Sequence, residues 1–290
     1  MPVLYSYTAM IPSLPPSTGP IGVFDSGYGG LTILDKIRGL MPEYDYIYSG
    51  DSARCPYGPR SFEVVYEFTL QAVSKLFELG CPLVILACNT ASAKALRTIQ
   101  QINLPVIDAT RRVLGVIRPT AECIGEITRS RHVGILATAG TIKSESYLLE
   151  IHKLSPDIVV TGEACPMWVS LVENNEYQSE GADYFVKQHI NRLLDKDPMI
   201  DTIILGCTHY PLLLDKIRQF TPGHIRIIAQ GEYVARSLQD YLNRHPEMDA
   251  RCEKGGKCRF LTTESENKFE ESASIFLGRQ DIKVESIALE

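Results

Sequence analysis

Short apolar runs alternate with longer amphipathic stretches along most of the chain, and this pattern predicts repeated strand–helix units. A short run that is apolar on both faces is typical of a buried strand, whereas apolar positions three and four apart indicate a helix. Such alternation is typical of parallel sheets covered by helices on both faces. Strands are predicted at 21–24, 44–49, 83–87, 105–107, 132–136, 158–161, 202–205, 225–228, 259–263 and 282–287. Helices are predicted at 31–40, 61–79, 91–101, 111–117, 144–154, 184–194, 212–220, 233–243 and 266–277.

Two predicted strands end in the same kind of hexapeptide. Residues 85–90 (ILACNT) and 204–209 (ILGCTH) each pass from apolar residues through a small residue to a cysteine, then to polar groups. A second pair of similar segments, 21–27 and 133–139, precedes them in the same order and at nearly the same spacing. The chain is therefore predicted to contain two related halves, each with one cysteine at a strand tip.

The predicted fold class is α/β, with two related parallel-sheet domains arranged with pseudo-two-fold symmetry. Residues 21–108 and 222–290 are predicted to form the first domain and 109–221 the second, after an irregular N-terminal tail, 1–20, that contains five prolines. Ligands of open α/β sheets bind at the carboxyl ends of the strands. The active site is therefore expected in the cleft between the two domains.

Composition narrows the class of protein without naming a function. The 290 residues are 44% hydrophobic and 22% charged, which is ordinary for a globular protein, and the net charge of −6 does not favour a nucleic-acid partner. Residues 1–20 lack Lys and Arg, so they do not resemble a signal peptide, and no apolar run approaches the roughly 20 residues of a membrane span. A cytoplasmic protein with no membrane partner is predicted, in which the eight cysteines are reduced thiols.

The paired cysteines point to proton transfer. Cys88 and Cys207 each lie where a strand ends and a helix begins, a position expected to favour the thiolate. One thiolate and one thiol on opposite sides of a carbon can remove a proton from one face and return one to the other, as racemisation requires. Asp25 and His209 are predicted to modulate the two thiols. Strand-tip donors suited to a carboxylate are Asn89, Thr90, Thr138, Thr141 and Thr208.

Other interpretations fit single residues. Most buried cysteines are small hydrophobic residues, which is the interpretation kept for Cys81, Cys123 and Cys165. Cys252 and Cys258 flank a glycine-containing turn like a metal knuckle, but no second ligand pair accompanies them, so no metal is predicted. A thiol hydrolase based on residues 207–209 leaves Cys88 unexplained. Two alternative roles also stay open: Asp25 could cap the helix that follows it, and Glu173 could be a solvent-facing residue.

Several motifs between residues 21 and 213 carry a family resemblance. They are GVFDSG (22–27) with GG (29–30), DSAR (51–54) with PYG (56–58), ACNTA (87–91), GTI (140–142) with Ser144, and LGCTH (205–209) with PL (211–212). The sequence resembles the glutamate racemases, cofactor-independent enzymes that supply D-glutamate for peptidoglycan. The segment 230–232 (QGE) differs from the Asp-Ser-Gly-Glu of many relatives.

The resemblance implies a set of site residues. Cys88 and Cys207 would be the two proton donors and acceptors, with Asp25, Glu173 and His209 tuning them. The implied substrate contacts are Asp25, Ser26, Tyr57, Gly58, Asn89, Thr90, Thr208 and His209, with Thr138 and Thr141 holding a carboxylate. The resemblance also implies glutamate as substrate, no cofactor, and a homodimer.

The sequence thus predicts a glutamate racemase that works by two-cysteine proton transfer at Cα. A first alternative is another two-cysteine racemase of the same superfamily, acting on aspartate or a hydantoin. A second is a non-catalytic protein that clasps a dicarboxylate between two lobes, which would need the carboxylate donors but not the thiols.

Overall fold

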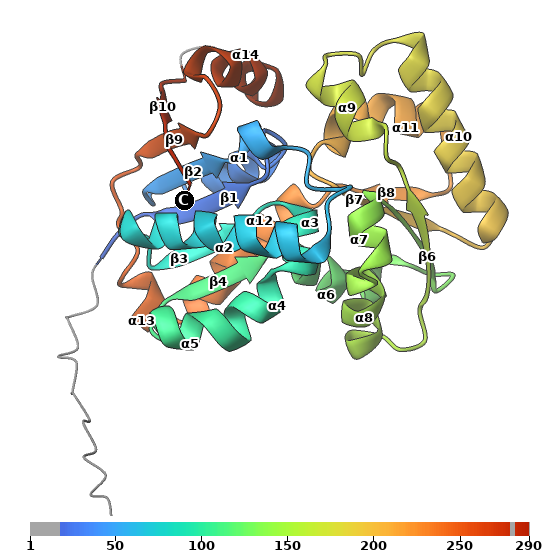
Figure 1. The fold of residues 1–290 in the computed structure, drawn as a ribbon. Helices are drawn as coiled ribbons and strands as arrows, with labels where there is room; N and C mark the ends of the chain where they lie inside the picture. Colours follow the sequence, from blue (N-terminus) through green and yellow to red (C-terminus); the bar gives the residue numbers. More distant parts are fainter. Residues whose placement is uncertain (1–17, 279–281, 290) are drawn as a thin grey trace, which may run out of the picture.

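The computed structural model describes residues 18–278 and 282–289, and within them it contains two parallel sheets. One has six strands in the order β10-β9-β2-β1-β3-β4, and the other has four in the order β6-β5-β7-β8. Figure 1 shows the two sheets side by side, each with helices packed against it. The predicted α/β class with two parallel-sheet units is confirmed. Most of the predicted N-terminal tail, 1–17, lies outside the described residues.

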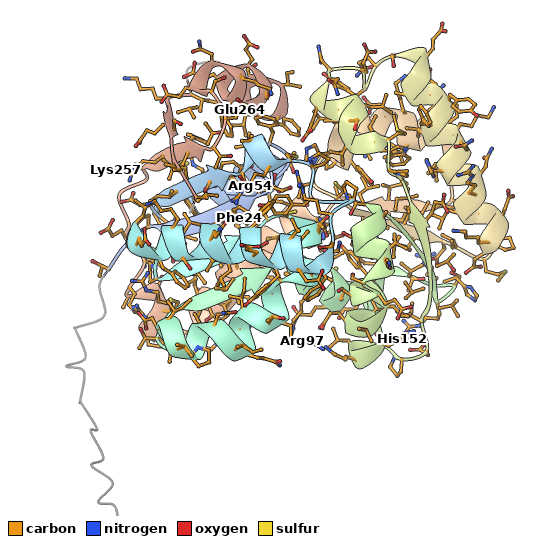
Figure 2. The ribbon with its side chains drawn as sticks, in the orientation of Figure 1. Phe24, Arg54, Arg97, His152, Lys257 and Glu264 are labelled. Carbon is orange, nitrogen blue, oxygen red and sulfur yellow. The ribbon has the colours of Figure 1, made fainter. Side chains whose placement is uncertain are left out.

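Helices cover both faces of the first sheet, and its three central strands are fully buried, which explains their uninterrupted apolar runs. Its strands are β1 Ile21–Asp25, β2 Tyr46–Gly50, β3 Leu83–Leu86, β4 Arg112–Gly115, β9 Cys258–Thr262 and β10 Val284–Ser286. One core cluster joins the sheet to α1 Leu31–Leu40, α12 Gly231–Arg244 and α14 Glu266–Leu277. A second cluster joins it to α2 Phe62–Glu78 and α3 Asn89–Lys94. Phe24, labelled in Figure 2, lies on β1 inside this second cluster.

The second sheet is also covered on both faces. Its strands are β5 His132–Ala137, β6 Val159–Ala164, β7 Thr202–Gly206 and β8 Arg226–Ile228. On one side pack α6 Ile117–Ile127 and α8 Ser146–Leu154, and on the other α9 Trp168–Glu173, α10 Glu180–Lys196 and α11 Leu214–Phe220. The short helices between these elements are η1 Ser52–Arg54, α4 Leu96–Thr98, η2 Ile99–Asn103, α5 Leu104–Ile107, α7 Ala139–Lys143, η3 Tyr210–Leu213 and α13 Pro246–Asp249.

Two segments connect the sheets. By strand pairing, the chain leaves the first sheet after β4 and returns to it after β8, through α12, which packs against α1 and also contacts α6. The domain boundaries predicted from the sequence, at 108/109 and 221/222, stay a prediction. No helix within the described ranges is both long and apolar enough to cross a membrane.

Two predicted elements near the first connection are wrong. The predicted strand 105–107 is the helix α5, which has Pro105 in its first turn, where a missing N–H costs nothing. The predicted helix 111–117 contains β4, whose backbone pairs with β3 from Leu83 to Leu86. The apolar stretch of β4 is short and partly exposed, so its sequence carries little periodicity, and pairing at the sheet edge decides its conformation.

Candidate active site

Both predicted cysteines lie at the carboxyl end of a central strand. Cys88 follows β3 and its Sγ accepts a hydrogen bond from the Ala91 N–H at 3.4 Å, so it caps α3. Cys207 follows β7 and precedes η3. Their exposed fractions are only 5% and 6%. Each half of the fold therefore delivers one thiol to the interior of the molecule.

The surroundings of Cys88 are neutral or negative. Its thiol donates to the Ser26 hydroxyl at 3.4 Å. Asp25, at the tip of β1, is fully buried and its Oδ2 accepts the Gly27 N–H at 3.0 Å. Its Oδ1 is buried without a hydrogen-bond partner among the described residues. An unpaired acceptor in this position can receive a donor from a ligand, because leaving it unpaired costs free energy.

Burial is the main cause of the raised pKa values of Cys88 and Asp25. It raises the pKa of the Cys88 thiol to about 12, and the negative charge of Asp25 adds to the increase. Burial likewise raises the pKa of Asp25, although the charge of His209 and backbone N–H groups oppose it. The expectation that the strand-to-helix position favours the thiolate is therefore wrong for Cys88, because loss of hydration outweighs the local hydrogen bonds.

Cys207 faces a chain of polar side chains. Its Sγ lies 3.8 Å from Nδ1 of His209, and Nε2 of the same imidazole lies 3.0 Å from Oε1 of Glu173. That carboxylate oxygen also accepts the thiol of Cys55 at 3.0 Å. Glu173 is thus not a solvent-facing residue: it holds the histidine that stands beside the cysteine.

The contacts among these side chains stabilise a positive charge on His209 and a negative charge on Glu173. Burial alone would lower the pKa of His209, but interactions with Cys207 and Glu173 outweigh it and raise the pKa well above its usual value. Burial opposes ionisation of Glu173, yet hydrogen bonds from His209 and Cys55 lower its pKa overall. The imidazolium and the carboxylate therefore form a buried ion pair beside Cys207.

The two halves of the fold are in close contact near the two cysteines. Thr32 on α1 donates to the backbone oxygen of Thr208 at 3.2 Å. Gly29 has no room for a side chain, because a Cβ there would lie 2.4 Å from Nδ1 of His209. The charge of Cys207 is among the causes that raise the pKa of Cys88. Residues brought together from the two halves are Asp25, Ser26, Cys88, Glu173, Cys207, Thr208 and His209.

A buried hydroxyl cluster also crosses between the halves. Thr90 Oγ1 lies 3.0 Å from Thr138 Oγ1, which lies 3.1 Å from Thr141 Oγ1. Gly58 packs against Thr138, and a Cβ at Gly58 would lie 2.9 Å from the Cβ of that threonine. Three adjacent hydroxyls offer several donors to one anionic group.

Two further residues predicted to contact the substrate form hydrogen bonds with other side chains of this protein. Tyr57 is buried and its hydroxyl donates to the Asp51 carboxylate. The side-chain amide of Asn89 binds Tyr147 and Gln230. Whether any of the predicted residues contacts a substrate stays a prediction.

Sequence reasoning missed Cys55, Tyr147 and Gln230. Cys55 lies between the motif segments 51–54 and 56–58, and Gln230 lies where 230–232 differs from many relatives, so both carried a signal. Tyr147 lies within an ordinary amphipathic helix and carried none.

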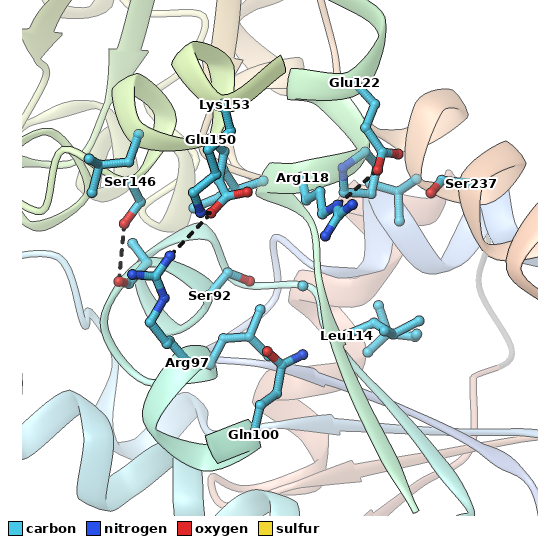
Figure 3. Close-up of a pocket in the computed structure, with 18 of the residues that line it drawn as sticks. Ser92, Arg97, Gln100, Leu114, Arg118, Glu122, Ser146, Glu150, Lys153 and Ser237 are labelled. Carbon is cyan, nitrogen blue, oxygen red and sulfur yellow. Dashed lines mark hydrogen bonds and ion pairs between the residues drawn. The ribbon is translucent and has the colours of Figure 1, made fainter. Parts of the chain in front are cut away.

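A cavity of about 720 Å³ lies apart from this site. Figure 3 shows polar and charged residues at its wall, among them Arg97, Arg118 and Glu150, and none of the predicted site residues lines it. In the described part of the chain, no cluster of three or more His, Cys, Asp or Glu side chains is arranged to hold a metal, at Cys252 and Cys258 or elsewhere.

Comparisons with known proteins place the chain in a family. A family model described as Asp/Glu/Hydantoin racemase matches residues 32–238. Glutamate racemase of Ruegeria sp. (strain TM1040) is 38% identical over 270 residues, 90% of this chain and 97% of that protein, and that of Bacillus cereus (strain ATCC 10987 / NRS 248) is 39% identical over 271 residues, 93% and 97%.

Solved structures give the same result. Glutamate racemase isoform RacE1 of Bacillus anthracis superposes with a TM-score of 0.84 at 36% identity, covering 93% of this chain and 98% of that one. The Francisella tularensis subsp. tularensis SCHU S4 glutamate racemase in complex with D-glutamate gives 0.83 at 32% identity, covering 94% and 98%. This chain belongs to the Asp/Glu/hydantoin racemase family.

Proposed function

We propose that the chain is a glutamate racemase that uses Cys88 and Cys207 as its two acid–base groups. The observation that carries the proposal is the burial of one thiol from each half, close enough for the charge of Cys207 to act on Cys88, each with its own polar neighbours. The glutamate racemases that match nearly the full chain support the choice of substrate. By the same resemblance, the product D-glutamate would serve peptidoglycan synthesis in the cytoplasm, and a homodimer is expected.

The reaction balances without a cofactor. The Cys207 thiolate takes the α-proton of the enantiomer whose α-hydrogen faces it, and the electron pair of the C–H bond stays on Cα, delocalised into the α-carboxylate. The Cys88 thiol then gives its proton to the opposite face and becomes the thiolate. The reverse sequence converts the other enantiomer. His209, held by Glu173, lies beside this cysteine and offers it a cationic neighbour during the transfer.

Substrate groups have matching partners. The unpaired Oδ1 of Asp25 is an acceptor for the substrate ammonium. The hydroxyls of Thr90, Thr138 and Thr141 are donors for a carboxylate. Because these groups are held in place before substrate binds, they can stabilise charge that develops in the transition state.

The test follows the optical rotation of L-glutamate with enzyme alone, without pyridoxal phosphate or added metal. Loss of rotation is expected with the wild type. Cys88→Ser and Cys207→Ser should each lower the rate roughly 1,000-fold, within the range for removal of an acid–base group. Cys81→Ser, which changes a buried thiol outside the site, is the matched control and should keep most of the activity.

Two outcomes contradict the proposal. Inversion of L-aspartate or a hydantoin with no change in L-glutamate would assign the chain to another racemase of the family. Glutamate binding without turnover, unaffected by either serine variant, would identify a dicarboxylate-binding protein.

A further inference from the structure

Three buried side chains close a ring of hydrogen bonds between the two halves of the molecule. Tyr147 Oη donates to Asn89 Oδ1 at 2.7 Å, Asn89 Nδ2 donates to Gln230 Oε1 at 2.6 Å, and Gln230 Nε2 donates to Tyr147 Oη at 2.6 Å. Every member both donates and accepts, so the bonds run in one direction around the ring. Such bonds polarise one another, and the loss of one weakens the rest.

Each cysteine segment is held by one member of the ring. Asn89 directly follows Cys88 in the chain. The aromatic ring of Tyr147 packs against Gly206, directly before Cys207, where an added Cβ would lie 3.1 Å from its Cε2. The charge of Cys207 is also among the causes that raise the pKa of Tyr147, after burial. The ring therefore joins the residue after one thiol to the residue before the other.

The third member ties together the two segments that connect the sheets. Gln230 lies between β8 and α12, on the second connection. Its Nε2 also lies 3.1 Å from the backbone oxygen of Val116, which lies between β4 and α6 on the first connection, and 3.2 Å from Oγ1 of Thr120. A change in the angle between the sheets would have to break these bonds.

Burial makes the ring costly to open. Asn89, Tyr147 and Gln230 are only 2–4% exposed. Buried amide and hydroxyl groups that lose their partners cannot regain them from bulk water without local opening. The set therefore has one preferred geometry, and the two cysteine segments share it.

We propose that Tyr147 and Gln230 are positioning residues that, through Asn89, fix the separation of Cys88 and Cys207 across the substrate carbon. This inference rests on the proposed function for its kinetic test. Neither residue needs to touch the substrate. Their role is to keep the second thiol in reach of the carbanion that the first has made.

Two variants remove ring bonds with little change in shape, Tyr147→Phe and Gln230→Met. Tyr46→Phe is the matched control, because the hydroxyl of Tyr46 is buried and donates to the Met41 backbone oxygen at 2.8 Å, at the start of β2. Both ring variants should lower kcat by roughly 10- to 100-fold, as expected for a displacement of about 1 Å at the reacting groups, with KM within about threefold. The kcat of the double variant should be no lower than that of the less active single variant, because the ring acts as a unit.

A second readout separates positioning from loss of folded protein. In D₂O, a misplaced second thiol leaves the carbanion to be reprotonated by the first thiol, after that thiol has exchanged with solvent. Deuterium in recovered L-glutamate, relative to D-glutamate formed, should therefore rise in both ring variants and not in Tyr46→Phe. Partial unfolding would lower both quantities together. Ring variants with the kcat and deuterium ratio of Tyr46→Phe would overturn the proposal.

A third readout needs no turnover. Backbone amide exchange, followed by mass spectrometry, should become faster in the peptides around 88–89 and 206–207 in both ring variants. If wild-type protein fails to racemise L-glutamate, the proposed function falls, and this measurement alone decides the ring. Unchanged exchange at both segments would then refute it.

Discussion

The segments around Cys88 and Cys207 are alike in backbone and unlike in charge. Cys88 lies two residues after β3 and caps α3, Cys207 directly follows β7, and both are buried. Cys88 has a hydroxyl and a carboxyl group for neighbours, whereas Cys207 has an imidazole held by Glu173. The backbone symmetry supplies a thiol from each half, and the side-chain asymmetry gives the two thiols different electrostatic surroundings.

This difference indicates how two like groups can perform opposite tasks. A base must be charged and an acid must be protonated at the same pH. Burial and the charge of Asp25 raise the pKa of Cys88, whereas Cys207 lies beside His209, whose own pKa is raised. The two thiols thus have unlike electrostatic surroundings, which the two opposite tasks require.

Removing the imidazole should have the largest effect on this contrast. We expect His209→Gln to lower kcat/KM roughly 100-fold, because the thiolate of Cys207 loses its cation. L- and D-glutamate have equal free energies, so the fall must be the same in both directions. The assay is racemisation followed from each enantiomer. His189→Gln is the matched control, since that buried histidine pairs with Glu163 at 2.7 Å elsewhere in the second sheet's core.

The same variant has a pH signature in stability. The pKa of His209 is raised on folding, so its contribution to the free energy of unfolding is fully present below about pH 6.5 and is lost as pH rises through the raised value. The stability difference between wild type and His209→Gln, from urea unfolding, should therefore shrink at high pH. A difference that grows with pH would contradict the ion pair.

Neutralising Asp25 should reduce the difference between the electrostatic surroundings of the two cysteines. Without this negative charge, the pKa of Cys88 should fall, and alkylation of Cys88 at fixed pH should become about tenfold faster, as a decrease of one pKa unit would give. The measurement is iodoacetamide labelling of Asp25→Asn resolved by peptide mass spectrometry. Activity should fall about tenfold, because the negative charge that would pair with the substrate ammonium is lost. Cys81, whose pKa burial also raises to about 12, is the internal control and should label unchanged.

The smallest expected effect concerns Cys55, which supports only the Cys207 side. Cys55→Ala removes one hydrogen bond that lowers the pKa of Glu173, so that pKa should rise toward 4.5. Activity at neutral pH should fall about threefold, the effect of losing one modest hydrogen bond. The acid limb of the pH–rate profile should move to higher pH. Cys55→Ser keeps a donor and should restore both, and an acid limb equal in wild type and Cys55→Ala would show that the thiol does not act on Glu173.

Much of the fold could be predicted because burial on two faces leaves a strong pattern. Apolar runs marked β1, β3, β5 and β7, and small residues marked the turns that follow them. The prediction failed between 105 and 117, where short, half-exposed segments take their conformation from edge pairing and helix packing. The cysteine pair was predicted from repetition, His209 from its place two residues beyond Cys207, and the tuning role of Glu173 from the resemblance. Cys55, Tyr147 and Gln230 were missed because their partners are distant in sequence.

The sequence by itself determined which residues could do chemistry and that each half would bring one cysteine to a strand tip. Alternation of strand and helix forces parallel pairing, and parallel pairing brings those tips to one edge of each sheet. Only the tertiary structure decided the protonation of the site and its rigidity. Both depend on burial and on contacts between the two halves, such as the charge of His209 acting on Asp25 and the ring through Gln230, and these exist only once the sheets have docked.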